Sequence, residues 1–119
     1  MRRAPVAPAI ERLAWESSEE ICAPHLIDVE VAQVLRRLER SGEMDKERGE
    51  EAIRDLSDMR IIRYGHEILM GRVWELRHNL TAYDAVYVAL AEVLDAPLIT
   101  CDGRLSRSGG HRARIRLVS

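Results

Sequence analysis

A chain of 119 residues, 46% hydrophobic and 32% charged, is long enough for one globular domain but not for two. Its formal net charge of −2 argues against a protein that binds nucleic acid through overall charge, and no apolar run is long enough to span a membrane. Cys22 and Cys101 each lie in a short apolar run, so we expect buried thiols in a reducing compartment rather than a disulfide. The composition predicts a single cytoplasmic domain over residues 1–119.

Helix and strand patterns alternate along the chain. In chain order, the expected elements are a helix over 9–17, a strand over 21–23, helices over 26–41 and 45–57, a strand over 61–64, helices over 66–78 and 81–94, and strands over 98–101 and 113–118. This order predicts an α/β fold with a parallel sheet and helices on its faces. No Gly-x-Gly-x-x-Gly motif follows a strand and no zinc-ligand spacing occurs, which argues against a dinucleotide or zinc site.

Asp84 is the most informative acid because the helix around it is apolar on nearly every side. A carboxylate buried there needs a partner. One interpretation is a capping box, in which Thr81 caps the helix and Asp84 reaches back to it. The other interpretation is a ligand or catalytic group, and the local sequence does not decide between them.

Two other acids occupy positions where ligands are often bound. Asp102 follows the strand over 98–101, and ligand sites in open parallel sheets lie beyond the carboxyl ends of strands, although Asp-Gly is also a common turn. Glu30 and Asp28 flank the apolar stripe of the first long helix, and helical angles do not choose between them. Acids gathered at one end of a sheet would repel each other unless they held a hard cation such as Mg²⁺ or Mn²⁺, which suits phosphodiester hydrolysis.

Three segments resemble the VapC-type PIN-domain ribonuclease toxins of type II toxin–antitoxin systems. They are RHNLTAYDAVYVALAE at 77–92, LITCDGRL at 98–105 and APHLIDVEV at 23–31, the last followed by Leu35-Arg36-Arg37. Their order and spacing fit the family from about residue 20 to the C-terminus. The Thr-x-Tyr-Asp-Ala block at 81–85 is the most specific of these features.

This resemblance implies a PIN-like three-layer α/β/α sandwich and an endoribonuclease dependent on Mg²⁺ or Mn²⁺. Its catalytic and metal-binding acids would be Glu30, Asp84 and Asp102, with Thr100 in a supporting position. It also implies a homodimer, a cognate VapB-type antitoxin that covers the acidic site, and structured RNA such as tRNA as the substrate. RNA contacts are expected at Arg77, His78, Asn79 and Arg104.

Residues 1–8 depart from the family, which normally opens with an apolar strand ending in an Asp. We therefore expect a fold that lacks the usual first strand and one metal ligand. Either the start of the chain is misassigned or truncated, or the chain is a degraded relative. The alternative function is a catalytically impaired module that only binds the antitoxin or associates with itself.

Overall fold

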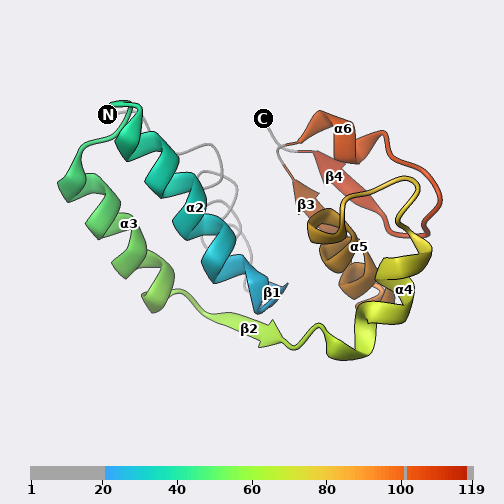
Figure 1. The fold of residues 1–119 in the computed structure, drawn as a ribbon. Helices are drawn as coiled ribbons and strands as arrows, with labels where there is room; N and C mark the ends of the chain where they lie inside the picture. The colour runs from blue at the N-terminus through green and yellow to red at the C-terminus, as the bar shows by residue number, and fades with distance from the viewer. Residues whose placement is uncertain (1–20, 101, 118–119) are drawn as a thin grey trace. The chain divides into compact units, whose positions relative to one another are not determined.

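The computed structural model describes residues 21–100 and 102–117, which belong to two compact units, Met1–Ile62 and Arg63–Ser119 (Figure 1). The helix expected over residues 9–17 lies outside the described residues. So does the region in which the usual first strand was expected to be missing. The single domain over residues 1–119 stays a prediction.

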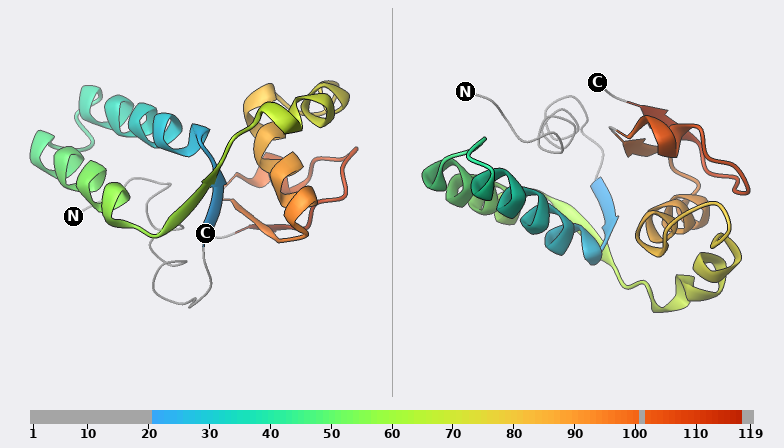
Figure 2. Two further views of the ribbon diagram at one scale, coloured as in Figure 1. Left: turned by 90° about the horizontal axis from the view of Figure 1, so that it is seen from below. Right: turned by 45° about the horizontal axis from the view of Figure 1, so that its top comes forward.

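The first unit is built around a pair of helices. Strand β1 (Ile21–Pro24) leads into α2 (Leu26–Arg40), which is followed by α3 (Lys46–Asp58). Figure 2 shows α2 and α3 side by side in both views. The helices pack through a small apolar cluster: Val31, Val34, Leu35, Leu38, Met44 and Ala52.

The turn between these helices follows from its residues. Gly42 adopts a φ of 82°, the left-handed conformation that ends many helices and that glycine tolerates best. Asp45 then caps α3 because its Oδ1 accepts a hydrogen bond from the Arg48 amide at 2.8 Å. Both helices therefore begin and end within a residue or two of the predicted positions.

Strand β2 (Ile61–Tyr64) occupies the predicted residues and pairs with β1 in a two-stranded sheet. The short strand predicted over 21–23 is also confirmed, extended by Pro24. Cys22 is exposed, so the prediction of a buried thiol is wrong there. In β1 the two buried residues are Ala23 and Pro24, and Cys22 precedes them on the exposed part of the strand. Cys101 lies outside the described residues.

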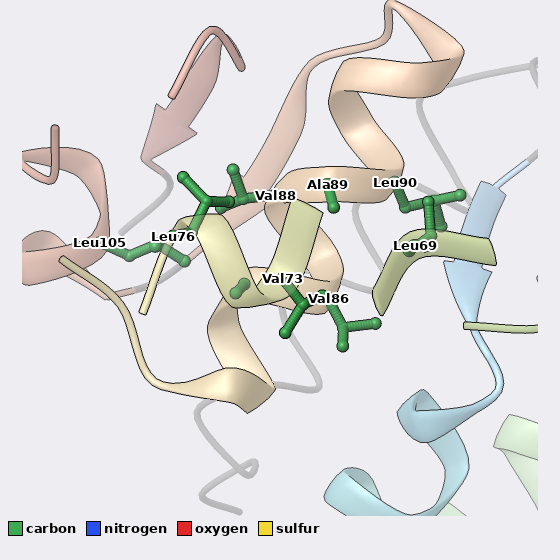
Figure 3. Packing of buried hydrophobic residues seen from close by; sticks show 9 residues of the cluster. Leu69, Val73, Leu76, Val86, Val88, Ala89, Leu90 and Leu105 are labelled. Atoms are coloured by element: carbon green, nitrogen blue, oxygen red, sulfur yellow. The ribbon is translucent and has the colours of Figure 1, made fainter. Parts of the chain in front are cut away.

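The second unit has its core between α4 (Met70–Glu75) and α5 (Ala82–Leu94), with the 3₁₀ turn η1 (Glu67–Leu69) before α4. The single helix predicted over 66–78 is therefore shorter and irregular. Figure 3 shows Val73 of α4 beside Val86 of α5, and Leu76 beside Leu105. The buried cluster comprises Leu69, Val73, Leu76, Ala85, Val86, Val88, Ala89, Leu90 and Leu105. Burial on so many sides explains why α5 carries almost no polar residue after its first turn.

Strands β3 (Leu98–Thr100) and β4 (Ile115–Leu117) form the second sheet, and they run parallel with Leu98 opposite Ile115. The parallel pairing confirms the predicted α/β class. A short helix, α6 (Gly103–Ser106), follows β3 where the sequence predicted only a turn. Within the described part of the chain, no helix is long and apolar enough to cross a membrane.

Candidate functional site

Asp84 lies in the first turn of α5, which Thr81 caps. The Thr81 hydroxyl accepts a hydrogen bond from the Asp84 backbone amide at 3.2 Å. The reciprocal half of a capping box is not formed, because the Asp84 carboxylate makes no hydrogen bond or ion pair within residues 21–100 and 102–117. Capping therefore explains the position of the Asp84 backbone and leaves its half-buried carboxylate available for a ligand.

Asp102 is held by its neighbours on both sides. Its backbone amide donates a hydrogen bond to Thr100 Oγ1 at 3.0 Å, and its Oδ1 accepts one from the Arg104 amide at 2.8 Å. The second bond caps α6, so the predicted turn role is fulfilled as a helix cap. One carboxylate oxygen is thereby occupied. Thr100, predicted as a supporting residue, orients the backbone of Asp102.

Glu30 lies in α2, two residues after Asp28. Its Oε1 is buried without a hydrogen-bond partner among the described residues. Asp28, by contrast, takes part in an interaction of its own. A buried oxygen without a donor is costly unless a ligand satisfies it. Glu30 is therefore the better ligand candidate of the two acids that helical angles left undecided.

The three predicted acids divide between the two units: Glu30 belongs to the first, and Asp84 and Asp102 to the second. Among the described residues there is no group of three or more His, Cys, Asp or Glu side chains that could hold a metal ion. The ligand set Glu30, Asp84 and Asp102 thus stays a prediction.

The residues predicted to contact RNA have different environments. The Asn79 side chain donates a hydrogen bond to the Gly109 carbonyl at 2.8 Å and so fastens the segment before β4. His78 is exposed, and so is Arg104, whose side chain is 88% accessible. The guanidinium of Arg77 lies over the ring of Trp74, 4.5 Å from its centroid. Asn79 thus has a structural role, while the other three side chains remain accessible.

An ion pair in the second unit was missed by the sequence analysis. The Glu92 carboxylate, only 3% exposed, accepts hydrogen bonds from Arg72 Nε and Nη2 and from the Arg112 amide. The hydrogen bonds from Arg72 outweigh burial and lower the pKa of Glu92 to about 2, while the same bonds raise the pKa of Arg72. The only local signal was an acid at the end of an apolar helix face, and its partner is twenty residues away.

Comparison with known proteins defines the family. The pattern of the PIN domain matches residues 2–110. Ribonuclease VapC1 of Mycobacterium tuberculosis is 46% identical over 97 residues, covering 81% of this chain and 73% of the relative. Ribonuclease VapC9 of the same organism is 41% identical over 102 residues, covering 86% of this chain and 80% of the relative. Ribonuclease VapC12 of the same organism is 38% identical over 101 residues, covering 85% of this chain and 78% of the relative.

The chain therefore belongs to the PIN-domain family, among its VapC-type toxins. The resemblance drawn from the segments at 23–31, 77–92 and 98–105 is confirmed. The mixed helices and the parallel β3–β4 pair agree with the α/β fold of that family.

Proposed function

We propose that the chain is the toxin of a type II toxin–antitoxin pair and acts as an endoribonuclease dependent on Mg²⁺ or Mn²⁺. Glu30, Asp84 and Asp102 would hold the metal. Support for the reaction comes from the relatives named VapC ribonucleases, which share 38–46% identity over more than four-fifths of the chain. The chain would act in the cytoplasm.

The observation that carries the metal site is the buried Oε1 of Glu30, which lacks a donor within the described residues. An anionic oxygen in that state is stabilised by a cation, and carboxylate oxygens are the ligands that Mg²⁺ and Mn²⁺ prefer. The Asp84 carboxylate is likewise not engaged within the described part of the chain, and one oxygen of Asp102 remains after helix capping. The donor set therefore fits a hard divalent cation.

When bound, the metal would supply a water of lowered pKa and neutralise charge on the phosphate. The protein's own residues would orient that chemistry. Thr81 fixes the backbone at Asp84, and Thr100 fixes the backbone at Asp102, so two carboxylates start from anchored main chain. Arg104 is close in sequence to Asp102 and exposed, which suits a contact with an RNA phosphate.

The substrate would be structured RNA such as tRNA, contacted by Arg77, His78 and Arg104. We retain Asn79 only as a residue that positions this segment, because its amide is bound to Gly109. A VapB-type antitoxin would neutralise the protein by covering the acids, and two copies would form a homodimer. Sedimentation of the chain alone and with the antitoxin tests both associations.

The test of the site combines metal binding with RNA cleavage. Calorimetry with Mn²⁺ and gel analysis of tRNA cleavage would compare the wild-type chain with Glu30→Gln, Asp84→Asn and Asp102→Asn. Each variant should bind Mn²⁺ more weakly and cut at least a hundredfold more slowly, and EDTA should stop the wild-type reaction. Asp95→Asn is the matched control, because Asp95 is 97% exposed and lies at the far end of α5. Asp28→Asn tests the competing acid of α2.

One outcome would favour the alternative function. If folded wild-type protein bound the antitoxin, yet left every RNA intact and took up no Mn²⁺, the chain would be an impaired binding module. Cleavage that persisted in Glu30→Gln but was lost in Asp28→Asn would instead reassign the acid of α2.

A further inference from the structure

Trp74 is a large aromatic residue that the core of the second unit does not use. It lies in α4 next to Val73, which is buried, but its own side chain is 67% exposed. Its helix has only six residues, and the core contacts here are made by Val73 of the helix and by Leu69 and Leu76 at its two ends. Packing in this core therefore does not account for the position of the indole ring.

Arg77 holds this ring in a defined arrangement. The guanidinium lies 4.5 Å from the ring centroid, and its Nη1 donates a hydrogen bond to the Trp74 carbonyl at 2.7 Å. Arg77 makes no ion pair with a carboxylate of the described residues. A guanidinium has five N–H donors, so most of them remain for another acceptor. The ring and the cation are therefore stacked, and no carboxylate among the described residues pairs with the charge.

The segment that carries this pair is ordered. The Arg77 amide donates to the Trp74 carbonyl, and the Leu80 amide donates to the Leu76 carbonyl at 3.0 Å. Asn79 then fastens the segment to Gly109. Two residues after Asn79, Thr81 caps α5 and fixes the backbone at Asp84. The surface is therefore preorganised, and it lies within the same compact unit as two of the proposed acids.

We propose that Trp74 and Arg77 form a stacking platform for one unpaired base of the RNA substrate, with the remaining N–H groups of Arg77 on a neighbouring phosphate. This inference rests on the proposed ribonuclease function and adds a base-binding position to it. RNA-binding proteins commonly stack unpaired bases on aromatic rings and on guanidinium planes. A protein partner is the competing occupant, since Trp and Arg are also common at the centres of protein interfaces, and sedimentation separates the two.

The test is a binding experiment without cleavage, in EDTA. The full chain carries Trp15→Phe, so that Trp74 is its single tryptophan. Binding of a tRNA hairpin loop oligonucleotide should quench Trp74 fluorescence. The affinities of all variants are measured by the anisotropy of a fluorescently labelled oligonucleotide, because Trp74→Ala and Trp74→Tyr leave no tryptophan to observe. Trp74→Ala should weaken binding about tenfold, and Trp74→Tyr should recover most of the loss. Ile68→Ala is the matched control, because Ile68 is an apolar side chain that is 88% exposed but has no ring. Its affinity for RNA should be unchanged.

Abasic nucleotides locate the stacked base. Removing that base should lower the affinity of the Trp15→Phe chain about tenfold. It should leave the affinity of the Trp74→Ala variant almost unchanged, because this variant already lacks the ring on which the base stacks. Raising the salt concentration should weaken binding by Arg77→Gln less steeply than binding by the Trp15→Phe chain, since Arg77 contacts a phosphate.

The failure of this inference is separable from that of the proposed function. If RNA is bound and cut but Trp74→Ala binds it as tightly as before, the platform is wrong and the ribonuclease stands. If Trp74→Ala changes only the sedimentation of the chain or of its antitoxin complex, the surface docks a protein and the platform is again wrong. If no variant binds RNA in EDTA and the wild-type chain cuts none with Mn²⁺, both proposals fail.

Discussion

Arg72 of α4 and Glu92 of α5 meet through two parallel hydrogen bonds, from Nε to Oε1 at 2.8 Å and from Nη2 to Oε2 at 2.9 Å. The same carboxylate accepts the amide of Arg112 at 2.7 Å, and the guanidinium reaches the carbonyl of Gly110 at 3.3 Å. Bidentate arginine–carboxylate pairs are among the stronger and more directional interactions in proteins. This pair joins α4, α5 and the segment before β4, which in turn sets the position of the β3–β4 sheet.

Replacing Glu92 by Gln should destabilise the chain by about 2–4 kcal/mol. The variant keeps the shape of the side chain but leaves the charge of Arg72 without its buried partner, which costs more than the pair contributes. Urea unfolding at pH 7 measures the difference. Glu75→Gln is the control, because Glu75 also contacts Arg72, at 3.3 Å, but is 66% exposed. We expect its free energy of unfolding to change by less than about 0.5 kcal/mol. Equal stability of the two variants would contradict the role given to Glu92.

Stability should fall on acidification between about pH 4.5 and pH 2. The pKa of Glu92 is lowered from 4.5 to about 2 in the folded chain, so the unfolded chain binds more protons across that range. The stabilisation by ionised Glu92 is complete above the unfolded-state pKa of 4.5 and is lost as the pH falls through the folded-state pKa of about 2. The shift corresponds to about 3 kcal/mol. Unfolding experiments at pH 7, 4 and 2.5 should show the difference in free energy of unfolding between wild type and Glu92→Gln becoming smaller. The contributions of the other carboxylates are the same in both chains, so they cancel in this difference. A difference that stayed constant over this pH range would contradict the lowered pKa of Glu92.

Gly110 should tolerate alanine poorly, whereas its neighbour Gly109 should accept it. Gly110 has a φ of 84°, and an added Cβ would also contact the side-chain amide of Asn79. A left-handed φ and a steric conflict together suggest a loss of about 2 kcal/mol for Gly110→Ala. Gly109→Ala meets no atom within 4 Å and should change stability by less than about 1 kcal/mol.

A double mutant separates the two costs at Gly110. In an Asn79→Ala background the steric conflict is absent, so Gly110→Ala should cost only the backbone strain, about 1 kcal/mol. Thermal unfolding of the four chains gives the coupling between the two positions. Strict additivity would show that the contact with Asn79 contributes nothing.

Local sequence was sufficient for the elements that depend on local interactions. Thr81 and Asp45 mark helix starts because their side chains bond to backbone amides three residues ahead, and β2 lies at the predicted residues 61–64. The helix predicted over 66–78 is shorter, because its apolar spacing continues after the backbone has turned at Leu76. The contact that holds this turn, from Asn79 to Gly109, spans thirty residues and leaves no periodic signal.

In the candidate site too, local sequence indicated some features, while others depend on contacts between distant residues. Asp84 and Asp102 stood out as candidates because one stands in an apolar helix and the other directly after a strand, and their role as ligands stays a prediction. Helical angles did not separate Glu30 from Asp28, and only the family resemblance preferred Glu30; the buried oxygen of Glu30 now supports that preference. Arg72 and Glu92 were not foreseen, since each alone looks like an ordinary surface charge on a short helix or a helix end.

Thr81→Ala should lower stability by about 1 kcal/mol, because it removes the hydroxyl that accepts the Asp84 amide at 3.2 Å. Thr81→Ser keeps an acceptor at the same place and should retain most of the stability. Amide hydrogen exchange gives a local readout: exchange at Asp84 should become faster in Thr81→Ala, while Ala89 in the middle of α5 should change less. If alanine and serine gave the same exchange rate at Asp84, the Thr81 hydroxyl would not be what anchors this end of α5. The anchoring proposed for the Asp84 carboxylate would then lose its support.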